Sequence, residues 1–187
     1  TDERILLLTG FAGLIAGACS MAMGEWLSVT SSRELYRSQI ETEAEELREV
    51  PDEEREELAL IYQAKGIEEA QARALADRLL GNKETALDTL AREELGIDPN
   101  DLGGSAWSAA ISSFLLFAIG AIIPVAPFLL LSGKGALIAS LAASGLGLAL
   151  IGAGTSLFTG RSMLFSALRQ LVIGLAAAGV TYGAGAV

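Results

Sequence analysis

The stretch from Gly17 to Glu57, GACSMAMGEWLSVTSSRELYRSQIETEAEELREVPDEEREE, begins as an apolar run and ends as a dense run of carboxylates. No proline interrupts it before Pro51. We therefore predict one helix that crosses a membrane and continues into water as an acidic helix. Val50 should end this helix, because the residue before a proline is pushed out of the α region. Pro51 then suits the first position of a second helix.

Composition divides the chain into a charged part and an apolar part. The 187 residues are 51% hydrophobic and carry a net charge of −10. Residues 33–106 hold nine basic and 20 acidic residues, whereas residues 107–187 hold three basic residues and no acidic one. The acidic part favours cations or basic surfaces as partners and excludes nucleic acid. The apolar part predicts a lipid bilayer as its surroundings.

Four segments are long enough to cross a hydrocarbon layer of about 30 Å at a rise of about 1.5 Å per residue. They are residues 5–30, 107–131, 134–157 and 164–187. We expect an all-α, multi-pass membrane protein with a helical subdomain between its first two spans. The expected divisions are 1–32 for the first span, 33–104 for the acidic subdomain and 105–187 for three Gly-rich spans.

Within the subdomain, the pattern predicts that the first helix runs to Glu49 and that three more follow, at about 51–66, 67–80 and 83–95.

Pro124 and Pro127 are expected to kink the second span. Gly13 and Gly17 have the spacing of a helix-packing face.

Basic residues predict the orientation of the spans. Nine lie in the acidic subdomain, and Arg161 and Arg169 flank the turn before the last span, whereas the loop before the third span holds only Lys134. Because Lys and Arg accumulate on the cytoplasmic side, the subdomain and the Arg161 turn should be cytoplasmic. The N-terminus should lie on the opposite side.

The chain has no histidine and a single cysteine, Cys19. An intrachain disulfide, a catalytic triad and a His/Cys zinc site are therefore excluded. We do not expect an enzyme. A metal site would have to use carboxylates, thioethers, backbone carbonyls and water, which suit hard or borderline divalent ions.

Some carboxylates in the acidic segment have no helical counterion. Several acids, such as Asp52 with Arg55, have a basic residue three or four positions away, which is typical of a solvated helix face. Other acids have no such neighbour, and Glu43, Glu46, Glu54, Glu57 and Glu94 are among them. If Pro51 folds the first two helices into a hairpin, the first four converge, and such oxygen-rich clusters bind divalent cations. A solvated face is the alternative, and Glu54 also suits a role at the helix dipole.

Met21 and Glu25 lie four residues apart in the first span and so share a helix face. An ionisable group at this depth is energetically expensive and is usually functional. A thioether beside a carboxylate offers a stepping site for a transition metal. The alternatives are that Met21 fills the core and that Glu25 snorkels to the membrane interface.

The chain resembles the vacuolar iron transporter family. The resemblance rests on AGLIAGACSMAMGEWLSVTSSRE at 12–34, IYQAKGIEEAQA at 61–72 and ALDTLAREELGIDP at 86–99, and it covers essentially the whole chain. It implies a dimeric, proton-coupled antiporter that moves ferrous iron, and often manganese, out of the cytoplasm. It also implies five membrane helices, with a cytoplasmic metal-binding domain between the second and third.

Position by position, the resemblance implies that Met21 is a pathway methionine. It also implies metal-binding roles for Glu43, Glu46, Glu54, Glu57 and Glu94. Leu90 stands where the family usually has a metal-binding methionine, so one ligand is expected to be lost. No counterpart of the family's first helix, with its pathway aspartate, precedes the first span, and we interpret the sequence as N-terminally truncated.

The leading hypothesis is a membrane transporter of Fe(II) and Mn(II), with divalent ions, protons, the bilayer and a second copy of the chain as partners. No cofactor is expected besides the transported ion. The alternatives are a membrane-anchored metal buffer or sensor without flux, and a scaffold whose acidic domain binds a basic protein. We expect a bacterial or archaeal cell membrane, or a vacuolar-type membrane in a eukaryote.

Overall fold

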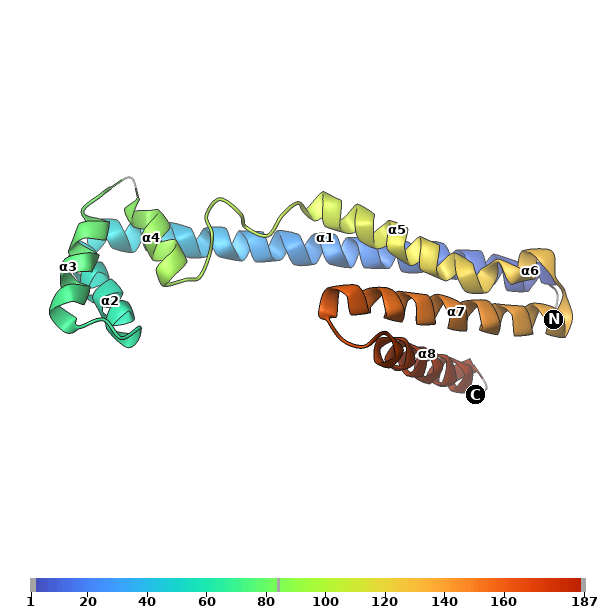
Figure 1. Cartoon of the computed structure of the whole chain (residues 1–187). Coiled ribbons are helices and arrows are strands. Elements are labelled where there is room, and N and C mark those ends of the chain that lie inside the picture. Colours follow the sequence, from blue (N-terminus) through green and yellow to red (C-terminus); the bar gives the residue numbers. More distant parts are fainter. Residues whose placement is uncertain (1–2, 84, 186–187) are drawn as a thin grey trace. The chain divides into compact units, whose positions relative to one another are not determined.

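The computed structural model describes residues 3–83 and 85–185, which contain helices and no strands. Figure 1 shows the arrangement. Four of the described helices are long and apolar enough to cross a membrane: α1 (Glu3–Glu49), α5 (Ala106–Val125), α7 (Gly133–Thr159) and α8 (Met163–Gly185). The expected all-α class with four membrane helices is confirmed.

Helix α1 is continuous over 47 residues, from its apolar start to its acidic end (Figure 1, blue to cyan). The predicted continuation of a membrane helix into an acidic helix is therefore present. Val50, with φ −131° and ψ 50°, has left the α region, and α2 (Pro51–Ala64) begins at the next residue. Steric conflict between the Pro51 ring and the preceding backbone explains the break.

The chain divides into two compact units, Thr1–Ala22 with Ser112–Val187, and Met23–Ile111. Helix α1 contributes residues to both units. We describe each unit by itself. The functional division at residues 32 and 104 stays a prediction.

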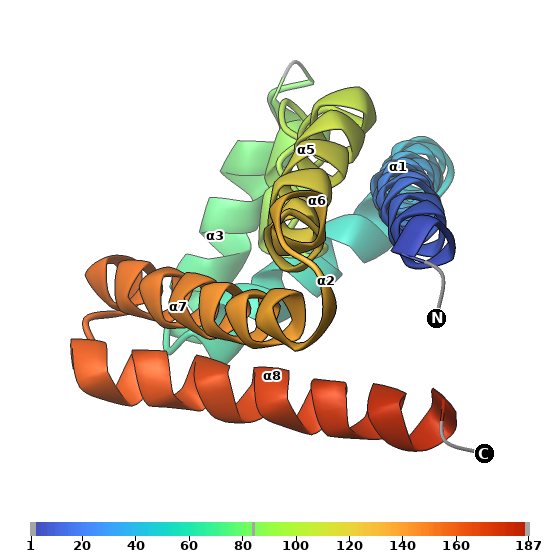
Figure 2. The same cartoon turned by 90° about the vertical axis from the view of Figure 1, so that its right-hand side faces the viewer.

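In the first unit, helices pack through small residues. Helices α7 and α8 lie side by side and antiparallel in both views (Figures 1 and 2). A Cβ added at Gly152 would lie 2.6 Å from the carbonyl oxygen of Ser166, so only glycine fits there. The ring of Phe117 packs directly on Gly17, whereas a Cβ added at Gly13 would meet nothing within 4 Å. Close backbone approach of this kind drives helix association in lipid.

The expected second span is divided at Ala126, which keeps α-helical angles (φ −55°, ψ −40°), and the kink at its prolines stays a prediction. Helix α5 ends at Val125, and the short α6 (Pro127–Leu130) follows. Proline lacks an N–H group, so Pro124 and Pro127 cannot continue one hydrogen-bonded ladder. The hydroxyl of Ser140 on α7 donates to the carbonyl oxygen of Pro124 at 2.7 Å and satisfies one acceptor at the break.

In the second unit, α2, α3 (Glu69–Leu80) and α4 (Ala86–Glu93) bury a small aliphatic core. Its largest fully buried side chains are Leu58 and Leu90. Leu47 near the end of α1 packs against this core and joins α1 to the other three helices. The core is small, so the unit gains further support from charged contacts at its surface.

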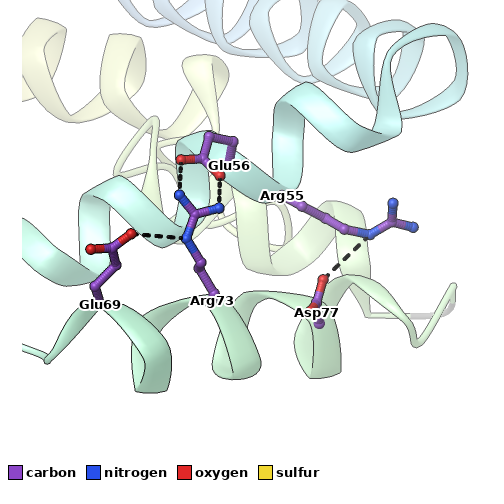
Figure 3. A network of polar contacts seen from close by, with 5 residues as sticks. All are labelled: Arg55, Glu56, Glu69, Arg73 and Asp77. Carbon is purple, nitrogen blue, oxygen red and sulfur yellow. Dashed lines mark hydrogen bonds and ion pairs between the residues drawn. The ribbon is translucent and has the colours of Figure 1, made fainter.

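Those contacts link α2 to α3 (Figure 3). Both terminal nitrogens of Arg73 bond the carboxylate of Glu56, one at 2.7 Å, and Arg73 Nε lies 3.4 Å from Glu69. Arg55 Nε lies 3.9 Å from Asp77. Arg73, four positions before Asp77 on α3, bonds Glu56 on α2 instead of Asp77. Each pair is partly exposed to water, which screens the charges, so its contribution to stability is small.

The predicted orientation can be measured by labelling. Cysteines placed at Glu68 and Gly133, both exposed, in a Cys19→Ser background should react with an impermeant reagent from opposite sides of the membrane. The unequal distribution of Lys and Arg among the loops is the reason. Labelling of both positions from the same side would contradict the orientation.

Candidate metal centre

The turn at Val50 and Pro51 brings three glutamates together. Glu43 and Glu46 lie one turn apart near the end of α1, and Glu54 lies in the first turn of α2. Each offers one carboxylate oxygen, and these three oxygens lie within 4.8 Å of one another. A divalent cation at the centre of such a group would be reached by all three carboxylates.

Two of these carboxylates are buried. Glu43 is 3% exposed and Glu54 is 4% exposed, while Glu46 is exposed and leaves the group open to solvent on one side. Among the described residues, Glu43 Oε1 and Glu54 Oε2 are buried without a hydrogen-bond partner. A buried carboxylate in this condition is costly unless a proton or a cation compensates it. The geometry therefore favours a positively charged ligand.

Glu94 joins this group from the end of α4, where it is the C-cap residue. Its Oε2 atom is also buried without a hydrogen-bond partner in the described chain. Glu57 is exposed on α2, and its negative charge raises the pKa of both Glu54 and Glu94. The structure thus gathers all five predicted metal-binding glutamates, three in a tight group and two beside it.

The pKa values of Glu43, Glu54 and Glu94 are all raised. Burial raises the pKa of Glu43 to about 8, and the carboxylates of Glu94 and Glu54 add to the rise. Burial also raises the pKa of Glu54; hydrogen bonding with Glu43 opposes this rise, and the charges of Glu46 and Glu57 add to it. The pKa of Glu94 is raised first by burial and then by Glu57. At neutral pH the group therefore holds protons that a metal ion would displace.

Leu90 is fully buried in the aliphatic core of α2, α3 and α4. This position therefore supplies packing and no ligand atom. With only carboxylate oxygens at the centre, the chemistry favours hard or borderline ions such as Mn(II) and Fe(II) over soft ones.

The two predicted pathway residues lie away from this group. Glu25 precedes Glu43 by 18 positions on α1, which is about 27 Å at 1.5 Å per residue. Its side chain is exposed in this single chain, and that of Met21 is 50% exposed. Both therefore remain accessible to a ligand or a partner.

Comparison with known proteins gives one consistent result. The family model of the VIT family matches residues 1–186. The chain is 31% identical over 182 residues to vacuolar iron transporter 1 of Oryza sativa subsp. japonica, covering 97% of this chain and 72% of that protein. It is 32% identical over 185 residues to vacuolar iron transporter 1 of Arabidopsis thaliana, with 97% and 72% covered. It is 34% identical over 189 residues to the vacuolar iron transporter of Acanthamoeba castellanii, with 96% and 68% covered.

Metal binding should depend on pH because of Glu43. Its raised pKa means that the protonated form dominates below about pH 8, so an ion must displace that proton. Mn(II) affinity, measured by calorimetry on the whole chain, should rise by about tenfold per pH unit between pH 6 and 8 and then level off. Glu45→Gln, an exposed acid outside the group, should leave this profile unchanged. A flat profile in the parent protein would contradict the assignment.

Proposed function

Because this chain belongs to the VIT family, whose members are membrane iron transporters, we propose that it moves Fe(II), and also Mn(II), out of the cytoplasm. In this proposal the acidic subdomain captures the ion and the membrane helices carry it across. The chain acts as a transporter and not as an enzyme, and the metal ion is its substrate. Protons moving in the opposite direction would drive the flux.

One observation carries the capture step: three glutamates share a site in which two carboxylates are buried and unpartnered. The protein keeps a cluster of carboxyl groups inside a small folded unit, where only protons compensate them in the absence of a metal ion. A divalent ion would relieve both the burial cost and the mutual repulsion of the carboxylates. A merely solvated acidic face would leave these oxygens in water.

The proposed path through the membrane uses Met21 and Glu25 on α1. A carboxylate near the cytoplasmic end of the span would meet the ion first, and the thioether lies one helical turn deeper. Protonation of Glu25 would weaken its hold on a cation and so couple release to the proton gradient. Exposure of both side chains in the single chain supports their access to an ion.

Two parts of the proposal rest on the relatives. The relatives named vacuolar iron transporter support iron as the substrate and a vacuolar-type membrane as the location in a eukaryotic cell. They lend no support to the expected bacterial or archaeal cell membrane. A homodimer remains part of the proposal, and the exposed apolar side chains of the membrane helices are compatible with a second copy or with lipid.

The second candidate function is a metal buffer or sensor that binds the ion without moving it. The buried glutamates support this function as well as transport, because capture is common to both. A scaffold that binds a basic protein is disfavoured, since such a partner would contact exposed carboxylates rather than buried ones. Flux through vesicles separates the transporter from the buffer.

Ion binding should require the glutamate group. Replacing Glu43, Glu46, Glu54 and Glu57 by Gln should abolish Mn(II) binding by the whole chain, because amides keep the size of the side chains but carry no charge. Calorimetry measures binding, and circular dichroism checks that helicity is unchanged. A matched variant with four exposed acids replaced by Gln, namely Glu41, Glu45, Glu49 and Glu53, should bind normally. Unchanged binding by the first variant would mean that these glutamates form only a solvated helix face.

Ion flux should require Met21 and Glu25 on α1 in addition to ion capture by the acidic subdomain. In lipid vesicles containing the protein, Met21→Leu and Glu25→Gln should each slow Fe(II) or Mn(II) uptake by about tenfold or more while leaving ion binding at the subdomain intact. Leucine and glutamine keep the bulk of the original side chains, so packing is preserved. Met23→Leu, at a methionine that is 70% exposed, serves as the control. Parent rates in both variants would remove the pair from the path.

A further inference from the structure

A second group of charged side chains lies in the second unit, Met23–Ile111, next to the α1–α2 turn. It is a cavity of about 480 Å³ bounded by the end of α1, the start of α2, the end of α3 and the start of α4. Three of its lining residues are basic, namely Arg48, Arg55 and Lys83, and none of the described lining residues is acidic. The remainder of its lining is apolar and includes Leu47, Leu80 and Ala86.

The basic residues around this cavity are only partly compensated. Arg55 is paired with Asp52 and, at 3.9 Å, with Asp77. Arg48 and Lys83 have no ion-pair partner among the described residues. Arg48 Nε donates to the carbonyl oxygen of Ala44 at 2.9 Å, which orients the guanidinium and leaves its terminal N–H groups available.

This distribution is unusual for a chain with a net charge of −10. Acidic residues outnumber basic ones in this segment by about two to one, so cations placed at random would find counterions nearby. Instead, three cations border one cavity and repel one another across it. An anion inside the cavity would remove that repulsion and accept charge-assisted hydrogen bonds from all three.

The volume of the cavity and its apolar wall indicate which kind of anion would fit. The volume lies within the range of about 300–1,000 Å³ that is usual for small-molecule pockets. A single inorganic anion would leave the aliphatic wall of Leu47, Leu80 and Ala86 uncovered. An anion with two or three negative groups on a compact organic frame would use both the charges and the wall.

We propose that this cavity binds a small soluble polyanion that carries phosphate or carboxylate groups, with its negative groups on Arg48, Arg55 and Lys83. The site is distinct from the metal centre, because Glu43, Glu46, Glu54, Glu57 and Glu94 do not line the cavity. Binding there does not require a metal ion. This proposal is therefore independent of the proposed transport function.

Calorimetric titration of the whole chain in metal-depleted, low-salt buffer tests the proposal, with pyrophosphate and citrate as separate probes. Binding of pyrophosphate alone would identify a phosphate ligand, binding of citrate alone a carboxylate ligand, and binding of both the shared polyanion chemistry. Arg48→Gln and Lys83→Gln should each weaken binding by about tenfold, and Lys83→Arg should retain it.

Arg78→Gln is the matched control, since this exposed arginine on α3 lies outside the cavity lining and its loss changes the net charge equally. It should leave the affinity unchanged. The proposal is overturned if neither probe binds at millimolar concentration. It is equally overturned if Arg78→Gln weakens binding as much as Arg48→Gln does, which would indicate a general charge effect. Circular dichroism on each variant confirms that the helices persist.

Discussion

Burial of Glu43 and Glu54 on either side of the Pro51 turn is the interaction on which the acidic unit depends. Two carboxylates that are removed from water and placed together oppose folding unless they are protonated or bound to a cation. Packing of Leu58 and Leu90 in the core holds α2 and α4 in place against this cost. In the proposed function, a bound cation would remove this cost.

Near the α1–α2 turn, the acidic unit has two groups of side chains with opposite charge. In one group, carboxylate oxygens from α1, α2 and the end of α4 gather without counterions. In the other, Arg48, Arg55 and Lys83 surround a cavity with an apolar wall. Because both groups include residues from the end of α1 and the start of α2, a ligand at either one would restrain the same hairpin. Binding energy at one site would then be available to order the other.

The membrane unit relies on a different principle. In lipid there is no hydrophobic force between helices, so close approach depends on small residues and on satisfied backbone groups. Small residues allow close approach at two places: Gly152 lies against the Ser166 backbone, and Gly17 lies under the ring of Phe117. The Ser140 hydroxyl satisfies the backbone carbonyl of Pro124, at the point where two prolines interrupt the helix. Large apolar side chains remain on the outside, as expected for a lipid-facing surface.

The sequence by itself determined the helical class, the four apolar spans, the continuous α1 and its end before Pro51, because these depend on local periodicity and on proline sterics. The absence of helical counterions also drew attention to the glutamates that the structure brings together, and their metal-binding role stays a prediction. Only the tertiary structure decided that Glu43 and Glu54 are buried while Glu46 stays exposed. It alone paired Asp77 with Arg55. The physical reason is that burial and cross-helix charge pairs depend on which distant segments meet, and no spacing along one helix contains that information.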